Sequence, residues 1–242
     1  MSDPYTYPGT NILRNHFGIK DQDTLDSVER RFTELRLRLI KRDYPLKGPF
    51  NESRYKATHQ YIFSDLYPMA GKYRTCELRK GSTLFALPAA ISLQSERIFS
   101  ELQHDKLLRS HNQNQVAASF AYYLGELNVL HPFREGNGRT QRVFLTHLAR
   151  DSGFALSWGN VSEEQMVDAS VASFRGDNSK FREIISTGLT PLQPAPTVTP
   201  ALGFEDHQQA EESSSKTSLF KSGEKKLTSD SVNDKSEDFE LD

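Results

Sequence analysis

Apolar residues recur every three or four positions along most of residues 20–190, which is the spacing of one buried face of an α-helix. In the first such stretch, residues 25–39, Asp23 or Thr24 is the expected N-cap. A later stretch opens on Ser162, with Gln165 three residues further on, the spacing of a capping box. We expect helices over residues 25–39, 55–66, 88–102, 113–130, 162–174 and 179–186, and another that ends at residue 152.

The helical pattern is interrupted at residues 72–86. Two short runs, 72–78 and 83–86, flank the sequence Arg79-Lys80-Gly81-Ser82, which resembles the turn of a β-hairpin. A connecting loop is one interpretation, and the residues alone favour it. The other is a flap whose unpaired edge binds an extended segment of a target protein by strand addition.

The composition of the chain changes beyond Gly188. Prolines come first, followed by Ser, Lys, Asp and Glu with few aromatic residues. Such a segment buries too little apolar surface to offset its chain entropy. We therefore expect a single, mostly helical domain over residues 1–190, opening with an irregular arm at 1–20, and a disordered Pro/Ser/acidic tail over 191–242. The tail is either inert or a segment for partner binding or secretion.

The overall composition excludes several functions. The net charge of −2 gives no basic field for nucleic acid or a membrane surface. Cys76 is the single cysteine, so no intramolecular disulfide can form. We find no long apolar run and no apolar leader. We expect no nucleic acid and no membrane as partners, and a reducing, cytoplasmic location.

The chemistry is concentrated in residues 131–142, the signature segment, which lies between two apolar helical patterns. It therefore resembles a loop that becomes the start of a helix, where free backbone N–H groups bind phosphate well. Gly136 and Gly138 allow the backbone to approach an anion closely. His131 can accept a proton near neutral pH, and Glu135 is a hard oxygen ligand suited to Mg²⁺.

Two arginines complete the segment. Arg139 and Arg142 are three residues apart and so share one helix face, where guanidinium groups can hold phosphate oxygens. Together with the histidine, the carboxylate and the glycines, they are the components of a phosphoryl or nucleotidyl transfer site. Packing alone does not explain why polar groups and flexible glycines lie between two helices.

This segment resembles the signature of Fic-domain proteins, His-x-Phe-x-Asp/Glu-Gly-Asn-Gly-Arg-x-x-Arg. The stretch Glu126-Leu127-Asn128 and the opening Asp3-Pro4-Tyr5 with Tyr7-Pro8-Gly9 also resemble bacterial members. The matching signature positions are His131, Phe133, Glu135, Gly136, Asn137, Gly138, Arg139 and Arg142.

The resemblance implies an all-α fold, a single Fic-type helical domain with a small β-hairpin flap at about 72–86. It implies a protein adenylyltransferase that transfers AMP from ATP to a Ser, Thr or Tyr hydroxyl of a target protein and releases pyrophosphate. ATP and Mg²⁺ are the implied cofactors, with the metal on Glu135. His131 would be the base, and Phe133 would anchor the loop. Nucleotide-binding groups would be Gly136, Asn137, Gly138, Arg139, Arg142 and, on the flap that docks the target, Lys80 and Gly81.

Other reactions fit the resemblance less well. A sibling branch that phosphorylates its target has a lysine where this chain has Gly138. Transfer of another nucleotide, or of phosphocholine, stays open because the signature specifies the diphosphate and leaves the base undefined. A non-catalytic nucleotide-binding module or scaffold is the alternative from another class, and the presence of both His131 and Glu135 argues against it.

Regulation is also suggested by the resemblance. Many Fic proteins are similar in having a helix with the motif Ser/Thr-x-x-x-Glu-Gly/Asn, whose glutamate pairs with the second signature arginine. The pairs Ser92 to Glu96, Ser179 to Glu183 and Ser236 to Glu240 leave that motif incomplete. We therefore expect a toxin restrained by a separate small antitoxin. The Ser179 to Glu183 helix is the second candidate inhibitor, and a secreted effector that modifies host proteins is the alternative role.

Overall fold

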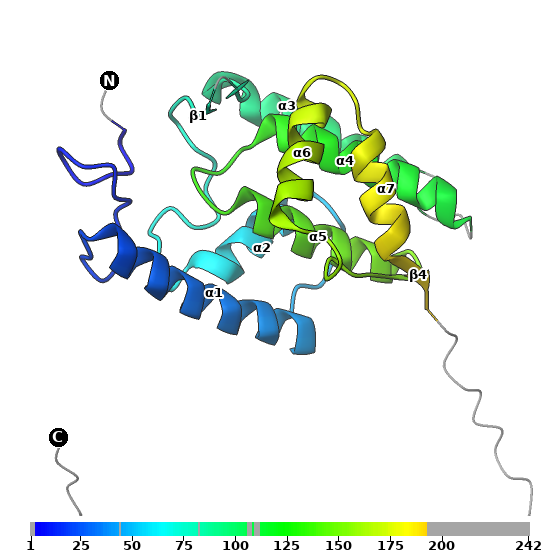
Figure 1. The fold of residues 1–242 in the computed structure, drawn as a ribbon, viewed down its shortest axis with the longest axis horizontal. Helices are drawn as coiled ribbons and strands as arrows, with labels where there is room; N and C mark the ends of the chain where they lie inside the picture. Colours follow the sequence, from blue (N-terminus) through cyan, green and yellow to red (C-terminus); the bar gives the residue numbers. More distant parts are fainter. Residues whose placement is uncertain (1–2, 44, 82, 106–107, 109–111, 193–242) are drawn as a thin grey trace, which may run out of the picture. The chain divides into compact units, whose positions relative to one another are not determined.

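The computed structural model describes residues 3–43, 45–81, 83–105, 108 and 112–192. Within these ranges the chain is mostly helical (Figure 1), as the sequence predicts. The helices are α1 (Gln22–Asp43), α2 (Glu52–Phe63), α3 (Pro88–His104), α4 (Gln113–Leu130), α5 (Asn137–Asp151), α6 (Glu163–Phe174) and α7 (Ser179–Gly188).

The helix ends follow local chemistry. Ser162 and Gln165 form the expected capping box of α6, and Pro88 opens α3. The N-cap predicted for the first helix is wrong: α1 begins at Gln22, and the carboxylate of Asp21 accepts the N–H of Thr24 at 2.9 Å. An N-cap carboxylate binds an N–H that the helix itself leaves unpaired, so the cap lies two residues before the earlier of the two predicted positions.

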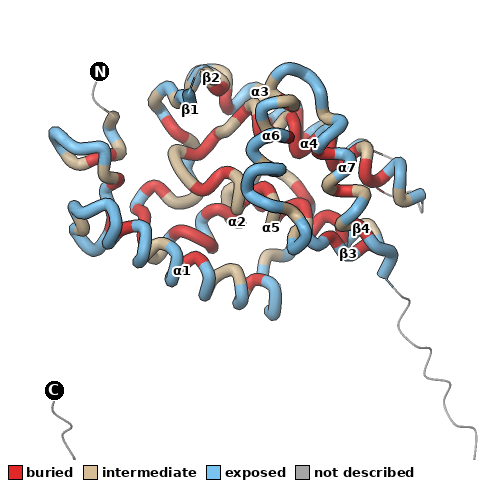
Figure 2. Tube along the Cα trace, viewed as in Figure 1, coloured by how far each residue is buried: buried red, intermediate tan, exposed pale blue. Residues whose placement is uncertain are grey.

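The central helix α4 is buried along most of its length (Figure 2). It contacts α3, α5, α6 and α7, and its apolar side chains join those of α5 in the main hydrophobic cluster. A second cluster lies between α1, α2 and the N-terminal arm and includes Leu25, Ile62 and Phe63. The signature segment leaves α4 and enters α5 between these two clusters, so its backbone is anchored on both sides.

Two short sheets complete the fold. Strands β1 (Arg79–Lys80) and β2 (Thr83–Leu84) pair antiparallel with Lys80 opposite Thr83, which confirms the hairpin. The strands are shorter than predicted, because residues 72–78 are not paired with any described strand.

The second sheet was not predicted. Strand β3 (Phe154–Leu156) pairs antiparallel with β4 (Leu189–Pro191), so the first residue of the predicted tail is part of a strand. Residue 192 is also described, and residues 193–242 of that tail lie outside the described ranges.

Candidate active site

His131 connects α4 to the signature segment and has an unusual backbone conformation. It is the C-cap of α4, in the left-handed region with φ 43° and ψ 58°. Non-glycine residues adopt this region rarely, so the surrounding bonds must hold it. The N–H of His131 donates to Leu127 at 3.0 Å, and its carbonyl accepts from Nε of Arg74 at 2.9 Å.

The imidazole of His131 is held by one hydrogen bond and one ring contact. Its Nδ1 lies 3.2 Å from the carbonyl oxygen of Asn128, and a carbonyl only accepts, so Nδ1 carries the proton. The ring stacks on Phe85 with centroids 3.9 Å apart. Burial, together with the charges of Arg74 and Lys80, lowers the pKa of His131 to about 4, against the opposing effect of the Asn128 hydrogen bond. At neutral pH the ring is therefore uncharged, and Nε2 has a lone pair to accept a proton.

Phe133 anchors the loop in the core, as expected. Its side chain is fully buried and stacks on His59 at a centroid distance of 3.9 Å. The side chain of Asn137 ties the loop to the start of α5: its Oδ1 accepts the N–H of Phe133 at 2.9 Å, and its Nδ2 donates to the Phe133 carbonyl at 2.8 Å. The Asn137 side chain is thereby committed to the loop, and its backbone N–H remains the group predicted to bind phosphate.

His59 has a structural role. It is buried, its Nδ1 accepts the N–H of Gly71 at 2.9 Å, and its Nε2 donates to the Glu135 carbonyl at 2.9 Å. Burial lowers its pKa to about 4, so the ring is a neutral bridge between α2 and the signature segment.

The start of α5 provides free N–H groups. Gly136 is the N-cap at φ 78°, with no side-chain cap bond, and a Cβ there would lie 2.3 Å from the ring of Phe63. The Gly136 N–H donates to the Glu135 carboxylate at 2.8 Å. The N–H groups of Asn137 and Gly138, in the first helical turn, have no intrahelical acceptor. The structure thus offers two of the three predicted groups to an anion, and the third is engaged.

The two signature arginines differ in their surroundings. The Nη2 atom of Arg139 lies 2.6 Å from Glu29 of α1 and 3.3 Å from Glu135. Both pairs engage Nη2, so a phosphate would have to share or displace them to bind that end of the guanidinium. Within the described part of the chain, Arg142 forms no ion pair with a carboxylate, and burial beside Arg139 lowers its pKa. Sequence reasoning missed Glu29, because nothing in the periodicity of α1 relates it to a residue 110 positions away.

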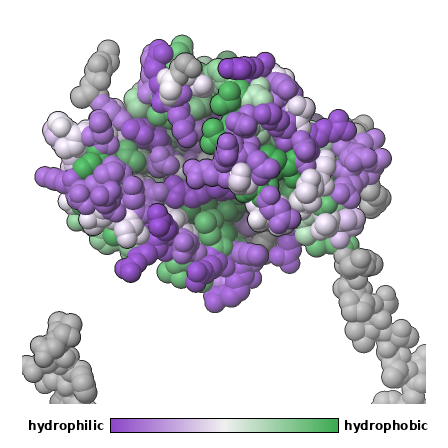
Figure 3. Space-filling model, in the orientation of Figure 1, coloured by the Kyte–Doolittle hydropathy of each residue, from purple (hydrophilic) through white to green (hydrophobic). Residues whose placement is uncertain are grey.

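A cavity of about 1160 Å³ opens beside these arginines, and both line it. Its walls come from α1, α5, α6, α7 and β3, and Figure 3 shows apolar surface above the C-terminal half of α1 with polar residues around it. Glu183 of α7 also lines the cavity, but among the described residues no salt bridge joins it to Arg142. His131 and Glu135 are not among the lining residues.

The remaining predicted groups are exposed. The carboxylate of Glu135 has a side-chain exposure of 43%, which suits a metal shared with a substrate, because Mg²⁺ is commonly held by one or two carboxylates together with phosphate oxygens. No described group of three or more His, Cys, Asp or Glu side chains could hold a metal ion alone. Lys80 and Gly81, at the tip of the hairpin, are exposed, and Lys80 is close enough to affect the pKa of His131.

No described helix has the length and apolarity needed to span a membrane.

Comparison with known proteins agrees with this geometry. Residues 49–149 match the model of the Fic/DOC family. The chain is 39% identical over 178 residues to a probable protein adenylyltransferase of Sinorhizobium fredii, covering 73% of this chain and 91% of the relative. It is 38% identical over 189 residues to the protein adenylyltransferase VbhT of Bartonella schoenbuchensis, covering 78% of this chain and 39% of that longer relative.

The fold is also found among solved structures. The BepC protein of Bartonella tribocorum, solved with bound AMPPNP, superposes with a TM-score of 0.73 at 22% identity, over 78% of this chain and 97% of that one. That identity supports the fold alone. The sequence relatives and the complete signature together establish the family: the chain belongs to the Fic/DOC family and is an enzyme of the nucleotidyltransferase class.

Proposed function

We propose that this protein transfers AMP from ATP to a Ser, Thr or Tyr hydroxyl of another protein. The observation that supports this best is the order of groups in one short segment. A half-buried, neutral His131 with a free Nε2 lone pair is followed by the uncapped start of α5. A base and an anion site in this order match what attack of an alcohol on a phosphorus atom requires.

The chemical step follows from these positions. The target hydroxyl oxygen attacks the α-phosphorus, its proton passes to Nε2 of His131, and the bond to the β-phosphate oxygen breaks, so that pyrophosphate leaves. The first-turn N–H groups of Asn137 and Gly138 receive phosphate oxygens. Arg142, half-buried and without an ion pair among the described residues, stabilises the leaving charge. Glu135 would hold Mg²⁺, whose charge offsets that of the phosphates.

We expect Arg139 to take part by exchanging partners. Its pairs with Glu29 and Glu135 hold the guanidinium beside the cavity that Arg139 lines. A triphosphate has more negative charge than either carboxylate, so it can compete for the guanidinium. We expect Arg139 to move from Glu29 to the phosphates when ATP binds.

The hairpin is the proposed docking edge for the target. Strands β1 and β2 form a sheet of two strands, so each has an outer edge to which an extended peptide can add. Lys80 at the tip is close enough to affect His131 electrostatically. A target segment paired with this edge would bring its hydroxyl toward Nε2, and the exposed Lys80 and Gly81 would cover the nucleotide.

We further propose that the enzyme is a toxin with a separate small antitoxin. The cavity beside Arg139 and Arg142 has room for a partner segment, and an acidic side chain there would compete with the phosphates. Expression of the wild type should arrest growth of a bacterial host, while His131→Ala should not. Equal growth of both strains would remove the toxin role without affecting the transferase proposal.

The test of the reaction is which phosphate moves. Lysate of the host is incubated with the protein and ATP labelled at either the α- or the γ-phosphate, and labelled bands are identified by mass spectrometry. The proposal predicts labelling from α-labelled ATP alone. Labelling from the γ-phosphate would indicate a kinase, and nucleotide binding without labelling would indicate a non-catalytic module.

A further inference from the structure

Arg74 is a buried cation on the segment between α2 and the hairpin. Its residue exposure is 2%, and burial lowers its pKa. Among the described residues, backbone carbonyl oxygens and no carboxylate bind its guanidinium. A buried charge is tolerated when hydrogen bonds satisfy it. The partners in those hydrogen bonds therefore show which parts of the chain Arg74 holds together.

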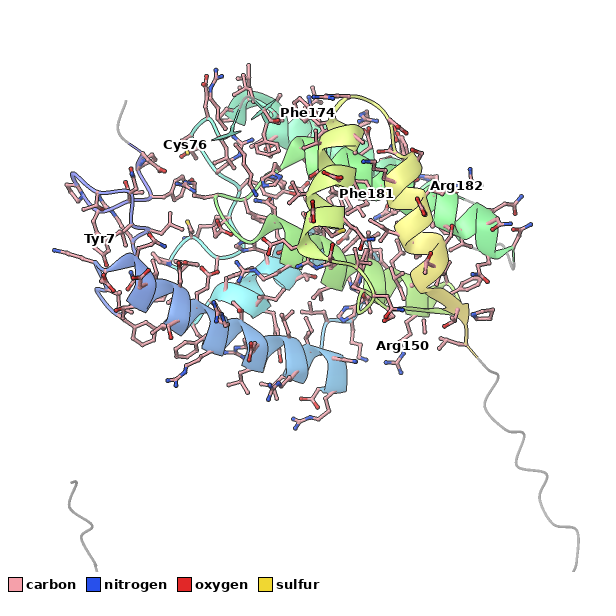
Figure 4. The ribbon with its side chains drawn as sticks, in the orientation of Figure 1. Tyr7, Cys76, Arg150, Phe174, Phe181 and Arg182 are labelled. Atoms are coloured by element: carbon pink, nitrogen blue, oxygen red, sulfur yellow. The ribbon has the colours of Figure 1, made fainter. Side chains whose placement is uncertain are left out.

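Those contacts join three parts of the chain. Nε of Arg74 donates to the carbonyl of His131 at 2.9 Å. Nη1 donates to Cys76 at 2.7 Å, just before the hairpin, and Nη2 donates to Ala86 at 2.6 Å, just after it. Nη2 also lies 3.4 Å from the carbonyl of Leu130, the last residue of α4. Figure 4 labels Cys76 on the segment that leads into the hairpin.

The backbone reinforces the same connection. The N–H of Arg74 donates to Pro132 at 2.8 Å, directly after the catalytic histidine, and the N–H of Ala86 donates to Val129 at 3.3 Å in the last turn of α4. Both ends of the hairpin segment are therefore bonded to the chain that carries His131. One rigid, planar guanidinium spans these attachment points, which a flexible ammonium could not do.

From these contacts we infer that Arg74 is a positioning residue: it fixes the backbone of His131 and the base of the hairpin relative to each other. This inference deepens the proposed function and rests on it. The general base would then lie at a set distance from the edge where the target docks. The left-handed conformation of His131 needs such support, and a cation at the C-terminal carbonyls of α4 is also favoured by the helix dipole.

Electrostatics gives a readout that does not depend on turnover. Arg74 and Lys80 are the charges that act on the His131 ring, and both oppose its protonation; Asn128 of α4 and Phe85 after β2 contribute uncharged contacts. Removing the charge of Arg74 should raise the pKa of His131. A lysine at this position keeps the charge and loses the planar guanidinium, so it should leave that pKa unchanged.

The experiment compares Arg74→Lys and Arg74→Gln with the wild type. For Arg74→Lys we expect kcat for α-labelled transfer to fall about tenfold to a hundredfold, because small displacements of a catalytic group have effects of that size. The KM for ATP should change by a smaller factor than kcat, since the N–H groups and arginines at α5 are untouched and only the hairpin that covers the nucleotide shifts. Arg74→Gln should show the same loss together with a raised pKa of His131, measured by NMR titration of its Cε1 signal.

Arg54→Lys is the matched control, because Arg54 is similarly buried and donates to a backbone carbonyl, that of Gly48 at 2.5 Å. It should lower Tm without changing kcat per folded molecule or the pKa of His131. If the Arg74 variants behave like this control, Arg74 is only structural and the inference is overturned. If the wild type itself fails to label any protein, the proposed function fails, and the NMR comparison still decides the electrostatic role of Arg74.

A measurement on the wild type covers the case in which the variants do not fold. Native-state hydrogen exchange should give the N–H groups of Arg74, Ala86 and His131 the same opening free energy, because one side chain bonds to both sides. Independent opening of the hairpin base and the histidine would contradict the inference.

Discussion

The glycine that caps α5 gives a prediction whose magnitude follows from the structure. In Gly136→Ala, the new methyl group would lie 2.3 Å from two ring atoms of Phe63, which is itself buried among α1 and α2 side chains. The residue must also keep φ at +78°. The left-handed conformation costs roughly 1–2 kcal/mol, and overpacking a buried ring costs about 1–3 kcal/mol.

The combined loss for Gly136→Ala is therefore about 2–5 kcal/mol, which corresponds to a fall of about 5–15 °C in Tm for a domain of this size. Thermal unfolding followed by circular dichroism measures it. Two matched variants separate the causes. In Gly81→Ala the residue also has a positive φ, but the new Cβ has no atom within 4 Å. Only the cost of the left-handed conformation should therefore be lost from the free energy of unfolding.

The second matched variant is Gly138→Ala. It places its Cβ 3.4 Å from Arg142 Nη1, an ordinary contact, without positive φ. Since alanine favours helix over glycine, this variant should be as stable as the wild type or more so, while its transfer rate falls because the methyl group lies at the phosphate site. If Gly136→Ala proves as stable as Gly138→Ala, the close approach of the loop to Phe63 is not as described.

Three further predictions concern charge and loop geometry. His59, His131 and His147 have folded-state pKa values of about 4, below the ordinary 6.5. The free energy of unfolding should therefore be highest above pH 6.5 and fall as the pH drops from about 6.5 toward 4. Thermal unfolding across that range tests this, and a flat profile would contradict the burial of the three rings. Glu29→Gln weakens the pair with Arg139 and should lower the free energy of unfolding by about 1–3 kcal/mol, whereas Glu34→Gln, in an exposed pair on the same helix, should leave it unchanged. Asn137→Ala removes both bonds to Phe133 and should destabilise by about 1–3 kcal/mol with a matching loss of transfer, and denaturation by urea would show whether it does.

Helix positions were the most predictable part of the fold, because each helix buries one face and its apolar spacing records that face. Strands β3 and β4 were missed because three residues are too few to establish an alternating pattern. The N-cap of α1 was misplaced because Asp21, Asp23 and Thr24 lie close together at its start, and sequence alone does not show which of them caps the helix.

The signature residues were predictable because their chemistry lies in one contiguous segment. Their partners were not, since Glu29 and Arg74 reach the site only through folding. The neutral state of His131 likewise depends on burial, which the residue type alone does not reveal. The sequence therefore predicts the candidate reacting groups, and the structure adds the residues that hold them and the burial that keeps His131 uncharged.

The central claim is that His131 accepts the proton of the attacking hydroxyl. Its most direct test measures transfer from α-labelled ATP by His131→Ala, together with the ATP affinity of that variant by calorimetry. The control is His104→Ala, which removes an exposed histidine on α3. The account predicts that His131→Ala loses labelling while binding ATP with nearly wild-type affinity, and that His104→Ala labels normally. Undiminished labelling by His131→Ala would contradict it.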